Sequence, residues 1–88
     1  MGKSLQNIVS EMDRVYATIQ GGSPNTLEIQ GVCADLSIFH DAHIEDAAFG
    51  DTLRLANAMA QECIQATTEK LIIARFQSCY ACVTKLAQ

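Results

Sequence analysis

The amino-acid sequence predicts an all-α protein, a single small domain (residues 1–88) that forms a bundle of three helices. Two observations predict this fold. Apolar side chains recur at intervals of three and four residues, the spacing that places them on one face of a helix. Helix-breaking residues are few, five glycines and one proline, and most of them lie between three long segments. Helices are therefore expected at about 4–20, 26–48 and 51–87.

The first helix begins after Ser4, a residue type that caps helix N-termini well. Its apolar residues fall within about a third of the helical circumference, so one face is buried. The helix ends near Gln20, because Gly21 and Gly22 readily adopt the conformations that end helices and Pro24 forms a turn. The buried face consists of Leu5, Ile8, Val9, Met12, Val15, Tyr16 and Ile19.

The second segment could begin as a strand or as a helix. Residues 26–31 alternate between apolar and polar like a strand, but the chain offers no second strand to pair with them. A helix is the better assignment, since Asn25 can cap it and Glu28 lies three residues further on. Gly31 costs about 1 kcal/mol relative to alanine, which predicts an irregular first turn or another backbone packed closely there. The apolar side collects Ile29, Val32, Cys33, Leu36, Phe39, Ile44 and Ala47.

The third segment, residues 51–87, contains no glycine or proline. Asp51 is suited to cap its N-terminus, and residues compatible with a helix continue to its end, so one long helix is expected. The alternative is a break near 67–68, where two β-branched threonines weaken the helix, which would give four helices of similar length. The first half carries two apolar stripes and should be covered from two directions. These stripes are Leu55, Met59, Cys63 and Ala66, and Leu53, Ala60, Ile64 and Leu71.

A long third helix predicts a homodimer. At about 1.5 Å per residue it would extend about 50 Å, and a first helix of about 25 Å cannot cover that length. An apolar stripe on its second half would then face a second copy or another protein. The residues predicted to bind a partner on this stripe are Ile72, Phe76, Tyr80, Val83 and Leu86.

The middle of the chain is acidic. No lysine or arginine lies between Arg14 and Arg54, whereas six acidic residues do. Nucleic-acid binding requires a basic face that neutralises phosphates, so no nucleic-acid partner is expected. An acidic surface suits either a solvated face that keeps a small protein dispersed or a contact with a protein partner. The acidic residues predicted to set the specificity of that contact are Asp35, Asp41, Glu45 and Asp46.

Both histidines, His40 and His43, fall near the middle of the apolar side of the second helix. The neighbouring carboxylates point to other sides, and Cys33 lies about 10 Å along the helix axis from His40, too far to share an ion. We therefore favour two partly buried, hydrogen-bonded side chains and predict no metal. A metal site at His40 and His43 and a pH-sensitive contact are the alternatives.

Cys79 and Cys82 have the C-x-x-C spacing of redox and zinc motifs. A redox pair of this kind lies at a helix N-terminus, where the thiol pKa is lowered, whereas this pair lies deep inside the third helix. Zinc would require a second pair, and Cys33 and Cys63 are lone residues far apart in the sequence. The four cysteines are therefore expected to be reduced, buried apolar side chains.

Membrane, secreted and enzymatic proteins are not expected. No apolar run approaches the roughly 20 residues of a membrane span, and charged residues appear too early for a secretory signal, which favours a cytoplasmic location. No glycine-rich phosphate loop or paired carboxylates lie on a suitable element, so no enzyme and no cofactor are predicted.

The predicted function is therefore protein–protein interaction. The chain would be a small, non-enzymatic helical regulator, inhibitor, adaptor or chaperone that binds another protein through apolar anchors surrounded by charged residues. The alternative is a metal- or redox-responsive small protein that uses His40, His43 and the cysteines.

Overall fold

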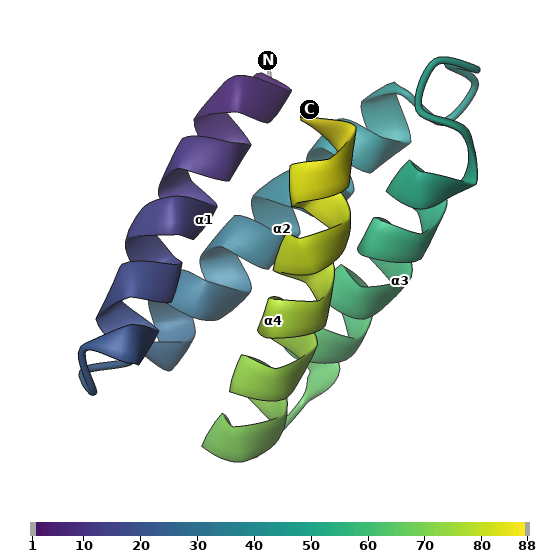
Figure 1. The fold of residues 1–88 in the computed structure, drawn as a ribbon. Coiled ribbons are helices and arrows are strands. Elements are labelled where there is room, and N and C mark those ends of the chain that lie inside the picture. The colour runs from purple at the N-terminus through teal and green to yellow at the C-terminus, as the bar shows by residue number, and fades with distance from the viewer. Residues whose placement is uncertain (1, 88) are drawn as a thin grey trace.

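The protein forms a bundle of four helices in the computed structural model, which describes residues 2–87. Residues 1 and 88 of the predicted domain lie outside the described residues. Consecutive helices run in opposite directions, so both ends of the chain lie at the same end of the bundle (Figure 1). The helices are α1 Leu5–Gln20, α2 Thr26–Ala42, α3 Gly50–Gln65 and α4 Glu69–Leu86.

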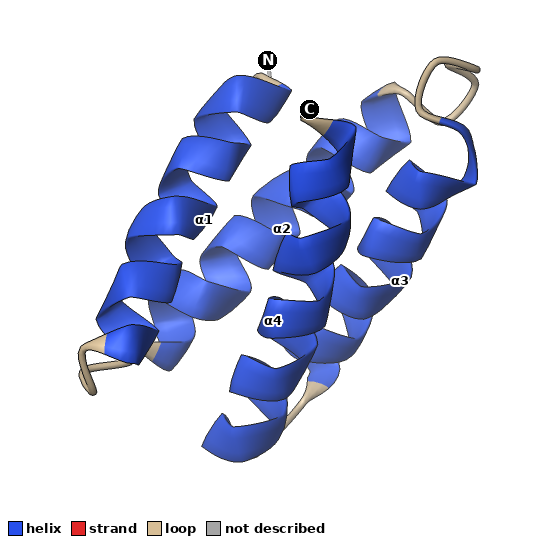
Figure 2. Ribbon diagram, viewed as in Figure 1, coloured by secondary structure: helices blue, strands red, loops and turns tan. Residues whose placement is uncertain are grey.

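Residues 2–87 contain helices, turns and loops, with no strand among them (Figure 2). The predicted all-α class is confirmed, and residues 26–31 belong to a helix. No helix in this part of the chain is long and apolar enough to cross a membrane.

The first two helices begin at the predicted caps. The Ser4 hydroxyl accepts a hydrogen bond from the Asn7 amide, and the Asn25 side chain accepts from the amides of Leu27 and Glu28. These bonds satisfy amides that have no acceptor within their own helices. After α1 the chain turns at Gly22, whose φ of 81° lies in the left-handed region that favours glycine.

The second helix ends at Ala42, six residues earlier than predicted. In a continuing helix the Phe39 carbonyl would accept from the backbone amide of His43, but it accepts from the His43 ring instead. The His43 backbone amide donates to the His40 carbonyl, three residues back, which tightens the last turn and ends the helix. Residues 43–49 form a loop in which Ile44 and Ala47 are exposed rather than part of the apolar side.

The expected long third helix is wrong, and the alternative break near 67–68 is correct. Thr68 caps α4, because its hydroxyl accepts a hydrogen bond from the Leu71 amide. From the adjacent helix α2, the Gln30 side-chain amide donates to the carbonyls of Cys63 and Ile64 in the last turn of α3 and of Ala66, the residue that follows it. Both helix ends at the break therefore have side-chain partners, which a continuous helix would not need.

The premise of the homodimer prediction disappears with the long helix. Helices α3 and α4 pack against each other along the most extensive contact of the bundle, and α2 covers α3. The homodimer itself stays a prediction, without that support.

Asp51 does not cap α3 as expected. The helix begins one residue earlier, at Gly50, whose φ of 56° again lies in the left-handed region. The residue before it, Phe49, makes no side-chain capping bond. Asp51 instead lies in the first turn, where a negative charge is favourable, and its carboxylate pairs with Arg54 at 3.1 Å.

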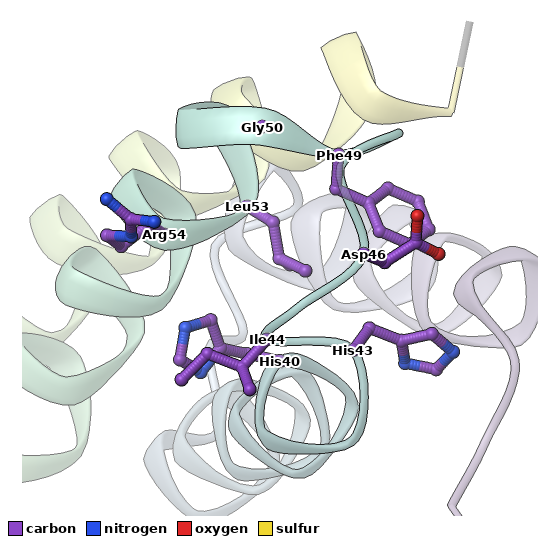
Figure 3. Close-up of a pocket in the computed structure, with 8 residues that line it drawn as sticks. All are labelled: His40, His43, Ile44, Asp46, Phe49, Gly50, Leu53 and Arg54. Atoms are coloured by element: carbon purple, nitrogen blue, oxygen red, sulfur yellow. The ribbon is translucent and has the colours of Figure 1, made fainter.

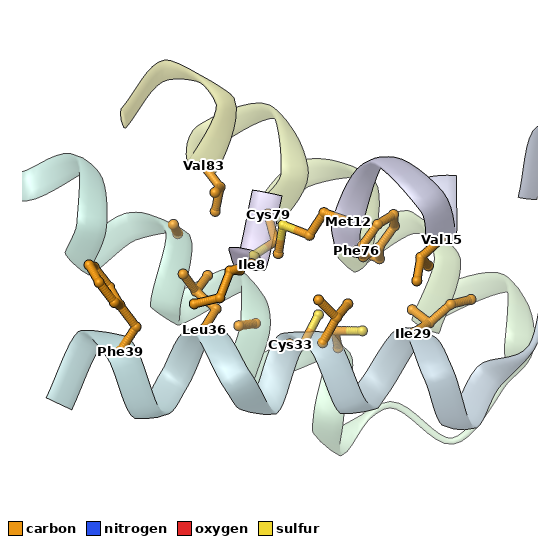
Figure 4. Close-up of a cluster of buried hydrophobic side chains, with 14 of the residues drawn as sticks. Ile8, Met12, Val15, Ile29, Cys33, Leu36, Phe39, Phe76, Cys79 and Val83 are labelled. Atoms are coloured by element: carbon orange, nitrogen blue, oxygen red, sulfur yellow. The ribbon is translucent and has the colours of Figure 1, made fainter. Parts of the chain in front are cut away.

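The core lies between all four helices, and much of it is visible where α1 and α4 face α2 (Figure 4). Phe76 of α4 is its largest fully buried side chain. The buried residues of α1 repeat at three and four, as predicted from the sequence. The hydrophobic core consists of Ile8, Met12, Val15, Ile29, Val32, Cys33, Leu36, Phe39, Leu53, Ala56, Ala60, Cys63, Ile72, Phe76, Cys79 and Val83.

Helix α1 is held to α2 by ion pairs between exposed side chains. The Lys3 ammonium, just before α1, lies 2.8 Å from an Asp35 carboxylate oxygen of α2 and also contacts Glu11 of α1. The Arg14 guanidinium lies 2.6 Å from a Glu28 oxygen. Because such pairs contribute only about 0 to 1 kcal/mol each, α1 depends mainly on its buried face for attachment.

Gly31→Ala is expected to stabilise the protein by about 0.5 to 1 kcal/mol. Gly31 is exposed within the regular part of α2, and a Cβ atom there would meet no atom within 4 Å beyond the backbone of its own helix turn. Neither the irregular first turn nor the close backbone contact expected at this position is present. A rise in the urea midpoint without a change in slope would support this result, and a fall would contradict it.

Candidate functional site

The two histidines lie where α2 ends and meets α3. His40 is buried, and its Nδ1 lies 3.0 Å from a carboxylate oxygen of Asp41. Its ring lies beside a small cavity of about 10 Å³ that is bounded on the α3 side by Leu53 and Arg54 (Figure 3). A space of that size has room for about one water molecule.

The His43 ring points away from that of His40 and belongs to an aromatic cluster (Figure 3). Its Nδ1 donates a hydrogen bond of 2.9 Å to the Phe39 carbonyl, and the ring stacks on Phe39 with centroids 4.0 Å apart. The Phe49 ring packs edge-to-face against the rings of Phe39 and His43. Because the two imidazoles diverge, they do not form two sides of one metal site.

Three cysteines from different helices meet in the core instead. Cys33 of α2 interacts with Cys63 of α3 and Cys79 of α4, and all three are fully buried. The Cys63 thiol also contacts the Ile72 carbonyl, with 3.4 Å between Sγ and oxygen. Within residues 2–87, however, no group of three or more histidine, cysteine or acidic side chains is placed to hold a metal ion.

The surroundings of these thiols disfavour the thiolate. The Cys33 thiol and burial both raise the pKa of Cys63 well above its usual range. For Cys33, the Cys63 thiol acts to lower the pKa, but Cys79 and burial outweigh it and leave the pKa raised. Both groups therefore remain neutral thiols near pH 7, the form that is least reactive.

The structure separates the two members of the C-x-x-C motif. Cys79 points into the core, while Cys82 lies on the partly exposed flank of α4. All four cysteines are free thiols. The pair lies in the middle of α4, away from the helix N-terminus where a thiolate would be stabilised.

Most of the apolar residues predicted to bind a partner lie inside the chain's own core. Ile72, Phe76 and Val83 are buried, and Leu86 is half-buried against them. A partner cannot reach the three buried side chains while α4 is packed in the bundle.

Tyr80, the remaining predicted anchor, joins α4 to α1. Its ring stacks on Tyr16 with centroids 5.0 Å apart and on Phe76 at 5.8 Å, and its hydroxyl donates to the Asp13 carboxylate. That hydrogen bond, with a smaller contribution from burial, raises the pKa of Tyr80 to about 12. The hydrogen bond to Asp13 is therefore fully present at neutral pH, and its contribution to stability is lost as pH rises from about 10 through 12.

The predicted acidic residues differ in how far they are neutralised by neighbours. Asp35 is paired with Lys3, and Asp41 contacts the His40 ring. Glu45 and Asp46 lie in the loop between α2 and α3 and form no ion pair with the described residues. One Asp46 oxygen accepts a bond from the Ala48 amide.

Ser37 and two amide side chains form a polar contact between α2 and α3. The Ser37 hydroxyl donates to the Asn57 side-chain oxygen at 2.6 Å, and the Gln61 amide donates to Ser37. This network contains no histidine or carboxylate that could remove the serine proton, so its chemistry is that of a structural hydrogen-bond network.

Comparisons with known protein families, with curated proteins and with solved structures found no match.

An apolar surface lies beside the histidine cavity, and sequence reasoning missed it as a site. Ile44 and Leu55 are 60% and 54% exposed. Arg54 connects them, because it borders both the cavity lined by Ile44 and a shallow open hollow lined by Leu55. We call this the Ile44–Leu55 surface, composed of Ile44, Asp51, Arg54, Leu55 and Ala58.

One sequence signal indicated part of this surface. The first half of the expected third helix carries two apolar stripes, and neither is buried along its whole length in the bundle. Leu53 is buried against α2, whereas Leu55, on the other stripe, faces outward. The position of Ile44 could not be found in this way, because it depends on α2 ending at Ala42.

Proposed function

We propose that this chain is a non-enzymatic protein-interaction module that acts as a regulator, inhibitor, adaptor or chaperone of another protein. In this proposal it binds through the Ile44–Leu55 surface. A cytoplasmic setting is part of the proposal, and the four free cysteines support it, because thiols stay reduced in that compartment.

One observation carries the proposal: two large aliphatic side chains, Ile44 and Leu55, remain more than half exposed around Arg54. A single exposed leucine is ordinary on a protein surface. Here two exposed aliphatic side chains each border a depression that Arg54 also lines, an arrangement typical of a binding surface. Because each side chain is only a little more than half exposed, covering it would contribute about 1 to 1.5 kcal/mol. Arginine at the centre of such a surface is also common in protein interfaces.

This proposal replaces the anchors predicted from the sequence. Ile72, Phe76 and Val83 stabilise the bundle itself, so the apolar contact shifts from α4 to the start of α3. Three of the predicted acidic residues, Asp41, Glu45 and Asp46, are retained because they lie near the loop between α2 and α3.

Affinity capture with matched variants tests the proposal. Immobilised wild-type protein, Leu55→Asp and Leu27→Asp are incubated with extract of the native host, and the bound proteins are identified by mass spectrometry. Leu27 is 81% exposed and lies at the opposite end of α2 from the proposed surface, so it is a matched control. We expect a partner that the wild type and Leu27→Asp retain and Leu55→Asp loses. An identical set of proteins on all three would contradict the proposal.

The alternative, a metal- or redox-responsive protein, has one observation in its favour, the meeting of three thiols in the core. The raised pKa values of Cys33 and Cys63 weigh against it, because a responsive cysteine is usually an accessible thiolate. Native thiol reactivity separates the two functions.

A further inference from the structure

We infer that the Ile44–Leu55 surface binds a basic amphipathic helix of the partner protein, with apolar side chains against Ile44 and Leu55 and lysine or arginine against the surrounding carboxylates. The inference rests on the proposed function and specifies the chemistry of the partner.

The apolar half of the inference comes from the spacing of residues on α3. Asp51, Arg54, Leu55 and Ala58 lie at intervals of three and four, so they share one face of the helix. The hollow that they line is shallow and open, and apolar surface predominates in it. A helix laid across such a face can place an apolar residue beside Leu55 and another beside Ile44.

The charged half comes from four carboxylates at the same end of the bundle. We call Asp41, Glu45, Asp46 and Asp51 the acidic rim; all four are exposed, and they lie in or beside the loop that joins α2 to α3. Among residues 2–87, Asp51 alone of the four is paired with a basic residue that carries a permanent charge, Arg54, and that pair is itself exposed. The rim therefore attracts positive charge, which favours a lysine-rich or arginine-rich segment.

The same charges argue against a second copy as the occupant. A symmetric contact through this surface would bring two acidic rims together, and each copy offers one arginine on this surface to offset them. Anionic lipid surfaces are disfavoured for the same reason. A basic protein segment satisfies both the apolar and the charged part of the surface.

Three synthetic peptides test this inference on the complete protein. Each is about 18 residues long, enough to form a marginal helix. All three carry leucine at every third or fourth position, and their remaining positions are lysine, glutamine or glutamate. Binding is measured by fluorescence anisotropy at low and high salt. We expect the lysine peptide to bind roughly tenfold more tightly than the glutamine peptide, and its binding to weaken as salt rises. The glutamate peptide should not bind.

Matched variants locate the binding. Leu55→Ser should weaken binding of the lysine peptide roughly tenfold, whereas Leu27→Ser should leave its affinity unchanged. Glu45→Lys should also weaken it, whereas Glu69→Lys should not, because the exposed Glu69 begins α4 at the other end of the bundle. Thermal melting of each variant confirms that it folds before binding is compared.

Several results would overturn the inference. The lysine peptide could fail to bind, or the glutamine peptide could bind as tightly as the lysine peptide. Alternatively, the control variants Leu27→Ser and Glu69→Lys could lose as much affinity as Leu55→Ser and Glu45→Lys. A dimer that Leu55→Ser abolishes in analytical ultracentrifugation would make a second copy the occupant. Sedimentation of the wild type with anionic phosphatidylglycerol vesicles would instead indicate a membrane. If affinity capture still yields a Leu55-dependent partner, the proposed function survives and only the basic helix is rejected.

Discussion

Phe76→Asp is expected to leave the protein unfolded at room temperature, so that it shows no cooperative melting transition. Phe76 is fully buried, and its ring stacks on Tyr80. Truncating a buried phenylalanine costs about 3 to 5 kcal/mol, and an unpaired carboxylate in its place adds the cost of burying a charge. A domain of this size is stable by only about 5 to 10 kcal/mol, so little stability remains.

Circular dichroism during thermal melting measures this effect. Phe76→Leu should keep a cooperative transition at a lower midpoint, because it preserves an apolar side chain. Asp41→Asn should melt like the wild type, since the Asp41 side chain is 78% exposed and an amide oxygen can still accept a bond from His40. A Phe76→Asp protein with the wild-type midpoint would show that this position is not part of the core.

Thiol reactivity is expected to divide the four cysteines into one fast and three slow groups. Cys82 is partly exposed and should react with a disulfide reagent within seconds to minutes. The buried Cys33, Cys63 and Cys79 should react only through unfolding, slower by roughly 10³-fold or more, because the reactive open state is that rare. The raised pKa values of Cys33 and Cys63 act in the same direction.

The release of thionitrobenzoate from Ellman's reagent measures both phases at pH 8. Cys82→Ser should remove the fast phase, and denaturant should make the remaining thiols react at once. If two thiols of the wild type reacted in the fast phase and both were missing from that phase in Cys82→Ser, Cys79 and Cys82 would form a reactive pair. That outcome would favour the redox-responsive function over the interaction module.

The helical class and two of the four helix beginnings could be predicted because they depend on local chemistry. Ser4 and Asn25 cap α1 and α2 through bonds to residues two or three positions away, which the sequence places beside them. The buried residues of α1, Ile8, Met12 and Val15, likewise follow from helical spacing.

The sequence predicts the break between α3 and α4 only as an alternative, because half of its cause is distant. Thr68 caps α4 through a bond to a residue only three positions away, so the local sequence indicates a start for α4. The Gln30 amide that satisfies the α3 carbonyls lies more than thirty positions earlier in the chain. Without that partner, a continuous helix and a broken one have similar local preferences.

The surroundings of His40 and His43 differ from the predicted ones for a similar reason. The sequence indicated hydrogen-bonded, partly buried imidazoles, and both do make such bonds. Their bonds are with the end of their own helix, and the His43 ring takes the Phe39 carbonyl from the backbone. A periodic pattern continued through residues 43–48 could not reveal this competition, and so it placed Ile44 in the core.

By itself, the sequence determined that this chain is helical, where α1 begins and ends, and that its middle is acidic. These properties depend on neighbouring residues or on composition. Only the tertiary structure decided which apolar residues remain outside: Phe76 is buried and Leu55 exposed, although both lie on apolar stripes of helical spacing. Spacing assigns a residue to a face, but whether that face is covered depends on where the other helices pack.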